Sequence, residues 1–173
     1  AITTADDVSL DAVRNVARTF RGVAHRMELI REFNGIRWYN SSVDSSPSRT
    51  MKTLAAFRER DERPVLIAGG QDKNSDYTGL GKAIASTTSN IILTGQNADL
   101  IEDIIRRETG DADVNYDDLI LLRVDSYQQA VETALSLAVP GGSVLLSPAG
   151  TSYDKFHHFE ERGEHFRQLV QAL

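Results

Sequence analysis

The stretch PVLIAGG, residues 64 to 70, decides the fold of this chain. It is a short apolar run that ends in two glycines, and similar runs recur as SNIILTG (89–95), LILLRV (119–124) and SVLLSPAG (143–150). Helical segments separate the runs, a pattern typical of right-handed βαβ units. We therefore predict an α/β fold whose mostly parallel sheet is buried on both faces.

The segment before the first run predicts an edge hairpin. MELIREFNGIRWYN (27–40) holds two β-prone runs around Asn34-Gly35, the strongest short hairpin signal. Ser46 and Pro47 then predict a helix start, with the serine as N-cap and the proline at the first helical position, and that helix should run to about Phe57 or Arg58. Further helices are expected at 80–86, 97–108, 126–138 and 159–173.

The first residues predict a separate amphipathic helix. Ser9 is its expected N-cap, and the residues that share one face at spacings of three and four are Leu10, Val13, Val16, Ala17 and Phe20. Gly22 should end this helix. No methionine occurs before Met27, and the helix has nothing before it to pack on, so we expect the chain to be a piece of a longer protein.

Composition excludes several classes of function. The 173 residues carry a formal net charge of −6 without a basic block, which gives no sign of a nucleic-acid partner. The absence of cysteine excludes disulfides and thiolate metal sites and fits a reducing cytoplasm. No run reaches membrane-spanning length, and the start does not have the layout of a signal peptide.

Ligands of open parallel sheets bind outside the carboxyl ends of the strands, so the loops there matter most. In AGGQDKNSDY (68–77), Lys73 could hold a carboxylate or phosphate, or it could be an ordinary solvated lysine. In SPAGTSYDKF (147–156), the hydroxyls and Gly150 could cradle an anion. The same loop could instead be a plain strand-to-helix turn in which Ser152 or Asp154 caps the next helix.

Other candidate motifs carry little information. His25-Arg26 could contact a nucleotide, but such pairs are usually surface residues. His157-His158 has no third ligand at suitable spacing, so we expect no metal site. GLGK (79–82) lacks the spacing of the phosphate-binding loop and of the dinucleotide fingerprint, so no nucleotide cradle is visible in this chain.

Taken in order, three runs resemble the C-terminal domain of the Mur ligases: HRMELIREFNGIRWYNSS (25–42), LIAGGQDKNSDY (66–77) and VLLSPAGTSYDKFHHFEERGEHF (144–166). The most specific part is S-P-A-x-x-S-x-D-x-F followed by F-x-x-R-G-x-x-F. The resemblance covers His25 to Leu173 and implies that 23–173 is the amino-acid-binding domain of such an enzyme. It also implies that this domain is a Rossmann-like three-layer α/β sandwich, with a mostly parallel sheet and an antiparallel edge hairpin. Residues 1–22 resemble the last helix and linker of the preceding ATP-binding domain.

The resemblance is strongest to the family member that adds D-glutamate to UDP-N-acetylmuramoyl-L-alanine for peptidoglycan. It implies that ATP, with Mg²⁺, phosphorylates the alanine carboxylate and that the glutamate amine attacks the acyl phosphate. This domain would bind the amino acid and close over ATP, beside the ATP-binding and UDP-binding domains of one cytoplasmic chain. We expect no catalytic residue, no bound cofactor and no activity in this piece alone, and no nucleic-acid or membrane partner.

The resemblance also implies roles for individual residues. The family lysine that contacts the glutamate side-chain carboxylate matches Lys73, and the serine and phenylalanine of that pocket match Ser152, beside Thr151, and Phe159. The histidine-arginine pair near the adenine and phosphates matches His25 and Arg26.

One loop departs from the family pattern. Where the family often has NDSKATNP, this chain has NSSVDSSP (40–47), so the nucleotide-facing aspartate is Ser41 and the lysine is Val43. The threonine that reaches the amino acid is Ser45, which keeps a hydroxyl. Val43 cannot replace a cation, so that contact is lost or supplied elsewhere. Asp44 should face ribose, magnesium or solvent, because a carboxylate would repel an anionic substrate.

Two alternatives stay open. Contacts to a side-chain carboxylate do not report chirality, so L-glutamate or another amino acid remains an alternative substrate of a Mur-type ligase. The chain could also be a free-standing Rossmann-like module that binds or regulates through a nucleotide or small acid. Folylpolyglutamate synthase is a more distant resemblance by fold.

Overall fold

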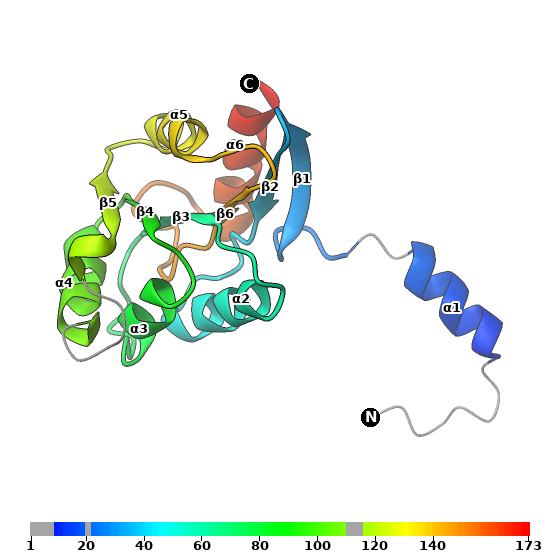
Figure 1. The fold of residues 1–173 in the computed structure, drawn as a ribbon, viewed down its shortest axis with the longest axis horizontal. Coiled ribbons are helices and arrows are strands. Elements are labelled where there is room, and N and C mark those ends of the chain that lie inside the picture. The colour runs from blue at the N-terminus through cyan, green and yellow to red at the C-terminus, as the bar shows by residue number, and fades with distance from the viewer. Residues whose placement is uncertain (1–8, 20–21, 110–115) are drawn as a thin grey trace.

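The computed structural model describes residues 9–19, 22–109 and 116–173, and its main body is a six-stranded sheet between two helical layers (Figure 1). The strand order is β1-β2-β6-β3-β4-β5. The strands are β1 (Glu28–Phe33), β2 (Ile36–Asn40), β3 (Val65–Ala68), β4 (Asn90–Leu93), β5 (Ile120–Arg123) and β6 (Ser143–Leu146). Only the β1–β2 pair is antiparallel, which confirms the predicted edge hairpin.

The helices divide between the two faces of the sheet. Those of the body are α2 (Pro47–Glu59), α3 (Leu80–Ala85), α4 (Ala98–Thr109), α5 (Tyr127–Leu137) and α6 (Phe159–Gln171). Helices α2, α3 and α4 lie below the sheet in Figure 1, and α5 and α6 lie above it. None of the helices in the described residues is long and apolar enough to cross a membrane.

The alternation of side chains along β3 explains why both faces are covered. Leu66 and Ala68 join the core cluster with α2, α3 and α4, whereas Val65 and Ile67 join the cluster with α5 and α6. All four residues are buried, because successive side chains of a strand point to opposite faces. A continuous apolar run therefore marks a strand between two helical layers, as the sequence predicts.

The hairpin turn has the geometry that its sequence requires. Asn34 and Gly35 have φ values of 53° and 74°, and two positive values are what a type I′ turn needs. The start of α2 only partly follows the prediction. Ser46 is the N-cap residue and Pro47 is the first helical residue, but the Ser46 side chain makes no capping bond and instead meets the Ser48 hydroxyl at 3.3 Å.

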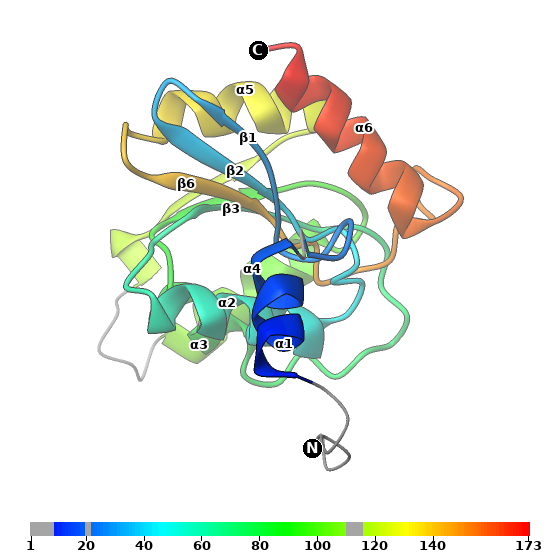
Figure 2. The same cartoon turned by 90° about the vertical axis from the view of Figure 1, so that its right-hand side faces the viewer.

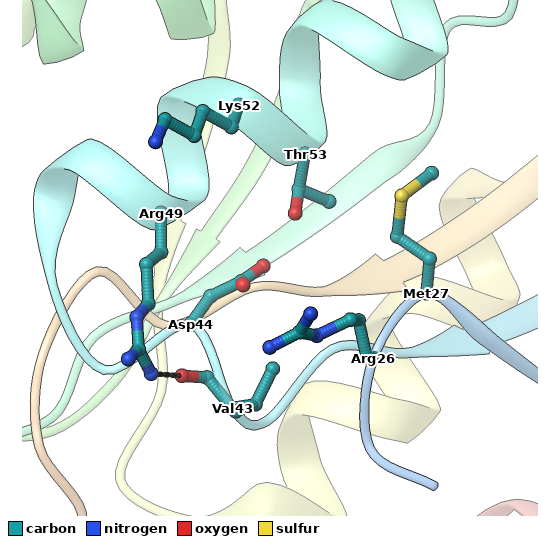
Figure 3. A pocket seen from close by; sticks show the side chains of 7 residues that line it. All are labelled: Arg26, Met27, Val43, Asp44, Arg49, Lys52 and Thr53. Carbon is teal, nitrogen blue, oxygen red and sulfur yellow. Dashed lines mark hydrogen bonds between the residues drawn. The ribbon is translucent and has the colours of Figure 1, made fainter. Parts of the chain in front are cut away.

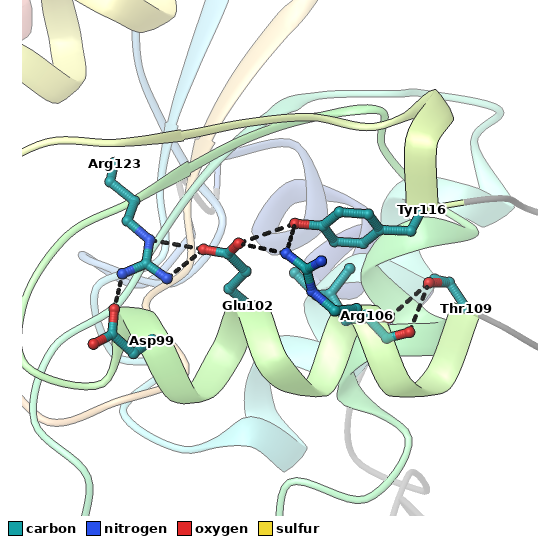
Figure 4. Close-up of polar contacts among 7 residues, drawn as sticks. Asp99, Glu102, Arg106, Thr109, Tyr116 and Arg123 are labelled. Atoms are coloured by element: carbon teal, nitrogen blue, oxygen red, sulfur yellow. Dashed lines mark hydrogen bonds and ion pairs between the residues drawn. The ribbon is translucent and has the colours of Figure 1, made fainter.

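The outer strand β5 is tied to α4 by an ion-pair network (Figure 4). Arg123 pairs with Asp99 and with Glu102, its Nε donating to Glu102 Oε2 over 2.7 Å. Tyr116, in the short 3₁₀ helix Tyr116–Asp118, donates to Glu102 Oε1 over 3.0 Å, and the Arg106 guanidinium lies 4.5 Å from the centre of its ring. These contacts fasten the edge strand β5 to α4.

Helix α1 (Leu10–Thr19) lies apart from the body in Figure 1, and in Figure 2, where that side faces the viewer, it stands in front of the body. Ser9 caps it, its hydroxyl accepting the Ala12 N–H over 3.1 Å, as predicted. None of its residues is buried, and Leu10, Val13 and Val16 are 72%, 51% and 62% exposed. Phe20, assigned to the same face by its spacing, lies outside the described residues.

Candidate functional site

The candidate site lies at the carboxyl ends of β3 and β6. The chain leaves β3 toward α3 on one face and leaves β6 toward α6 on the other, so the two loops diverge, as at the ligand crevice of open α/β sheets. Backbone hydrogen bonds between Gln71 and Thr151, 2.8 and 2.9 Å long, join the loops. The two loops singled out in the sequence are therefore one structural unit.

The glycines after β3 make this junction possible. A Cβ on Gly69, whose φ is +117°, would overlap the Thr94 carbonyl, and a Cβ on Gly70 would overlap the Thr151 carbonyl. Glycine at these two positions therefore lets the backbone after β3 come close to the loops after β4 and β6.

The predicted amino-acid-binding residues of this junction differ in what they leave free. Lys73 is exposed, and its Nζ lies 4.7 Å from the centre of the Tyr153 ring. Thr151 is buried and its hydroxyl donates to the Gln71 carbonyl over 3.2 Å. Ser152 is buried as well, and its hydroxyl forms no hydrogen bond with the described part of the chain. Lys73 and Ser152 thus keep donors available for a ligand.

Phe159 and Ser45 lie on neighbouring segments. Phe159 begins α6, its ring meets the His25 ring edge-on with centroids 6.2 Å apart, and its carbonyl accepts the Ser42 hydroxyl over 2.7 Å. Ser45 is half-buried and its hydroxyl contacts the Val43 carbonyl at 3.3 Å. A ligand that takes the Ser45 hydroxyl replaces only a local bond.

The loop after β6 does not cap α6 through Ser152 or Asp154, and that alternative is wrong. The helix begins only at Phe159, and the N-cap is His158, whose Nδ1 accepts the Glu161 N–H over 3.2 Å. The segment before it turns back on Ser152, whose carbonyl accepts the N–H of Phe156. The loop after β6 therefore continues beyond Ser152 before α6 begins, and Ser152 lies within the loop rather than at the helix start.

The histidine-arginine pair divides between the body and the surface. His25 is half-buried with φ of 61°, its N–H donates to Glu28 over 2.9 Å, and its Nδ1 lies 3.0 Å from Asn40 Nδ2. A Cβ on Gly163 would overlap its ring. Arg26 is exposed instead and lines a cavity. Of the two, Arg26 has the side chain that is free to meet a ligand.

Ser41 is fully buried and already uses its hydroxyl. That oxygen accepts the Met27 N–H over 3.2 Å, and the Ser41 N–H donates to the Leu146 carbonyl over 2.8 Å. These bonds connect the His25-Arg26 segment to the end of β6. The nucleotide-binding role of Ser41 stays a prediction.

One expectation placed the Asp44 side chain in solvent, and that expectation is wrong. It is 4% exposed, and its Oδ2 accepts the Ser147 hydroxyl over 2.7 Å. Its backbone carbonyl also accepts the Ala149 N–H over 3.0 Å. The carboxylate therefore fastens the loop after β2 to the loop after β6.

A cationic cavity of about 310 Å³ opens beside this loop (Figure 3). Its lining residues are Arg26, Met27, Val43, Asp44, Arg49, Lys52 and Thr53. Arg49 donates to the Val43 carbonyl over 2.9 Å, while the side chains of Arg26 and Lys52 form no hydrogen bond or ion pair with the described residues. Three cationic side chains and one carboxylate make the cavity suited to an anion such as phosphate.

Sequence reasoning missed Arg49 and Lys52, although a signal was present. They are three residues apart in α2, one turn beyond the loop that lacks the family lysine, and residues at this spacing share a helix face. Arg49 reaches the carbonyl of Val43 itself. The cation absent from position 43 is thus present in the same cavity, on the following helix.

Arg162 was also missed, because an arginine in an amphipathic helix is normally taken as solvent-exposed. It is fully buried and donates from Nε to Ser42 Oγ over 3.0 Å, from Nη2 to the Ser42 carbonyl over 2.8 Å and from Nη1 to the Gly150 carbonyl over 3.0 Å. Burial lowers the pKa of its guanidinium, which Tyr127, Asp154 and Asp44 partly offset. Arg162 therefore joins both candidate binding loops to α6.

The fold and this loop arrangement define an α/β ligand-binding domain, and comparison identifies its family. The family model described as "Mur ligase, glutamate ligase domain" matches residues 25–150, so the chain belongs to this family. The chain is 42% identical over 168 residues to the UDP-N-acetylmuramoylalanine--D-glutamate ligase of Acetivibrio thermocellus and 40% identical over 170 residues to that of Ruminiclostridium cellulolyticum. The matches cover 97% and 98% of this chain but 35% and 36% of those proteins.

Solved structures confirm the fold. A murein peptide ligase of Psychrobacter arcticus matches 94% of this chain and 33% of its own, with a TM-score of 0.58 at 16% identity. A folylpolyglutamate synthase of Mycobacterium tuberculosis, complexed with ADP, matches 92% of this chain and 36% of its own, with a TM-score of 0.61 at 13% identity. At such identities the likeness speaks for the architecture alone.

Proposed function

We propose that this chain is the C-terminal, amino-acid-binding domain of an ATP-dependent ligase that joins D-glutamate to UDP-N-acetylmuramoyl-L-alanine. The names of the relatives at 42% and 40% identity support this reaction. The observation that carries the proposal is the junction at the carboxyl ends of β3 and β6, where Lys73 and Ser152 keep free donors on loops paired through Gln71 and Thr151. An exposed ammonium and a hydroxyl are suitable partners for the side-chain carboxylate of glutamate.

The reaction fits a domain that binds and orients rather than one that supplies a nucleophile. ATP, with Mg²⁺, supplies the phosphoryl group that activates the alanine carboxylate, and the amine of the amino acid then displaces phosphate to form the amide. The domain would fix the side chain of the amino acid at Lys73 and Ser152, so that the amine has one direction of approach. Phe159, Thr151 and Ser45 would complete this side of the site.

The cationic cavity is the part of the chain that fits the phosphates of ATP. Arg26, Arg49 and Lys52 would neutralise phosphate charge, and closure of the domain would exclude water from the acyl phosphate. Within the described residues no group of three or more histidine, aspartate or glutamate side chains is placed to hold a metal ion. His25 and Ser41 would hold the backbone on either side of Arg26 in place through their hydrogen bonds to Glu28 and Met27.

Helix α1 fits the end of a preceding domain. We assign residues 1–22 to the terminal helix and linker of the ATP-binding domain, and 23–173 to the domain described above. The apolar face formed by Leu10, Val13 and Val16 is exposed here, and an apolar helix face ordinarily packs on a neighbour. The isolated chain should then show no ligase activity when ATP and the sugar nucleotide are supplied, and turnover would contradict the domain assignment.

The test of the reaction is an amino-acid panel with the full-length protein that carries this chain. Phosphate release is followed with ATP, UDP-N-acetylmuramoyl-L-alanine and one candidate amino acid at a time, including both enantiomers of glutamate and of aspartate. We expect D-glutamate to give the highest kcat/KM. A higher kcat/KM for any other amino acid would reject the proposed substrate while leaving the family intact.

A further inference from the structure

A buried hydrogen-bond chain runs behind the loop that carries Lys73. The Gly70 N–H donates to Asn97 Oδ1 over 2.8 Å, Asn97 Nδ2 donates to the Tyr77 hydroxyl over 3.0 Å, and that hydroxyl donates to Asp72 Oδ1 over 3.1 Å. Asn97 is 3% exposed and Tyr77 is 7% exposed. The chain thus connects the end of β3, the loop after β4 and the residue immediately before Lys73.

The direction of each bond in this chain is determined by its ends. The backbone N–H of Gly70 can only donate, so the amide oxygen of Asn97 must face it and the amide nitrogen must face Tyr77. The Tyr77 hydroxyl accepts from that nitrogen and gives its own proton to Asp72. Burial, with Asp72 nearby, raises the pKa of Tyr77 to about 12, so the hydroxyl keeps this proton throughout the neutral range.

Asn97 is the point where three loops meet. Its N–H also donates to the Gly70 carbonyl over 2.9 Å, so it pairs with Gly70 through both backbone and side chain. A Cβ on Gly150 would approach its Nδ2 to 2.7 Å, which places the loop after β6 against the same amide. Glutamine carries the same amide group, but its side chain is one methylene longer and could not make all of these contacts.

The segment from Asp72 to Asp76 has few other attachments. Asp72 Oδ1 also accepts the Ser75 N–H over 3.2 Å, which closes the segment on itself. The Lys73 ammonium forms no hydrogen bond or ion pair with the described residues and lies over the Tyr153 ring, which is itself exposed. Tyr77 anchors the far end, with its ring in the core beside α3 and α4. Together with the Gln71–Thr151 pairing before it, the bond between Tyr77 and Asp72 therefore limits the direction in which Lys73 leaves the sheet.

We propose that Tyr77 and Asn97 are positioning residues, which through Asp72 hold the Lys73 ammonium at the distance that selects an amino acid with a side-chain carboxylate. This inference rests on the proposed function, in which Lys73 meets that carboxylate. Neither residue touches the substrate. They act by limiting the orientations of the loop, because a loop ordered before binding loses less entropy when the ligand arrives.

Tyr77→Phe in the full-length protein tests the proposal, because it removes the hydroxyl and keeps the buried ring. Loss of an oriented contact to a charged ligand group should raise KM for the amino acid by about tenfold, with kcat and KM for ATP within about twofold of the parent. Asn97→Asp keeps an acceptor for Gly70 and loses the donor to Tyr77, so it should shift the same constant. The matched control is Tyr39→Phe, since Tyr39 is 8% exposed and its hydroxyl bonds to no described residue.

Hydrogen exchange of peptides spanning 71–76 gives a readout that does not need the substrate. Exchange should become faster in Tyr77→Phe and stay unchanged in Tyr39→Phe. An equal rise in KM for the amino acid and KM for ATP in Tyr77→Phe, or an unchanged KM for the amino acid, would overturn the positioning role. Lys73→Ala separates this failure from that of the proposed function: if it raises KM for the amino acid while Tyr77→Phe does not, only the positioning role is wrong.

Discussion

The Lys73 junction and the Arg26 cavity lie in one domain but are built by opposite means. The junction is held by backbone pairing between Gln71 and Thr151 and by the buried chain through Asn97, and it offers a ligand a few fixed donors. The cavity offers long cationic side chains, of which only Arg49 is tied down, by the Val43 carbonyl. Donors carried by a fixed backbone suit the choice of one amino acid, whereas long cationic side chains suit phosphate, which every nucleotide carries.

Arg162 is the residue that the two regions share, and removing it should have the largest effect. Arg162→Ala leaves Asp154 and Asp44 without a buried cation and frees the carbonyls of Ser42 and Gly150. We expect the free energy of unfolding to fall by about 3–5 kcal/mol, measured by urea titration of the chain with Trp38 fluorescence. Arg107→Ala, at an exposed position of α4, is the control and should change it by less than about 0.5 kcal/mol. If Arg162→Ala and Arg107→Ala lowered the free energy of unfolding by the same amount, the buried Arg162 contacts would not be what joins the two regions.

Removing charge from the cavity should affect the nucleotide alone. Arg49→Ala in the full-length protein should raise KM for ATP by about fivefold, an effect of the size expected for one partly screened cation, and leave KM for the amino acid unchanged. Adding Val43→Lys should restore KM for ATP, because the cation would then stand on the loop where the family often has it. Arg60→Ala, beyond the end of the same helix, is the control. No rescue by Val43→Lys would separate Arg49 from the missing lysine.

The smallest expected effect is a loss of folding free energy at acid pH through Glu28, which holds the His25-Arg26 segment beside the cavity. Burial opposes ionisation of Glu28, but the His25 N–H and the Arg167 guanidinium, 2.8 Å away, hold the pKa of Glu28 below its ordinary value of 4.5. A lowered pKa in the folded state adds stability that is fully present above the unfolded pKa and is lost as the pH falls through the folded pKa. Glu28→Gln should therefore cost about 0.2–1 kcal/mol at neutral pH.

That difference between Glu28→Gln and the parent should shrink as the pH falls below 4.5, measured by urea titrations across the acidic range. Over the same range the Tyr77 hydroxyl keeps its proton, because burial raises the pKa of Tyr77 to about 12. A difference that persisted at low pH would mean that packing of the Glu28 side chain, rather than its charge, holds the His25 segment.

The sequence predicts those features that depend on short-range pattern. The run around Val65 to Ala68 alternates between two buried faces, so its composition alone indicates a strand between helical layers. Asn34-Gly35 predicts its turn because few other pairs accept two positive φ values. The loops at the carboxyl ends of the strands follow from the parallel order, whereas the roles of Lys73 and Ser152 within them come from the resemblance to the Mur ligases and stay predictions.

Features that depend on distant partners could not be read in this way. Arg162 is buried because Ser42, 120 residues earlier, offers it an oxygen, and nothing in the local pattern of α6 distinguishes it from a surface arginine. Asp44 looks like a solvated loop carboxylate until Ser147 is placed beside it. Ser152 and Asp154 look like caps because serine and aspartate are common N-cap residues, whereas His158 is the residue that caps α6.

The domain is proposed to bind the amino acid at the Lys73 junction and ATP at the Arg26 cavity. The most direct test of this division is to measure KM for the amino acid and KM for ATP in Lys73→Ala of the full-length protein. The account predicts that KM for the amino acid rises at least about tenfold, since a contact between two charged groups is lost, while KM for ATP stays within about twofold. A rise in KM for ATP as large as that for the amino acid, or no rise for the amino acid, would contradict it.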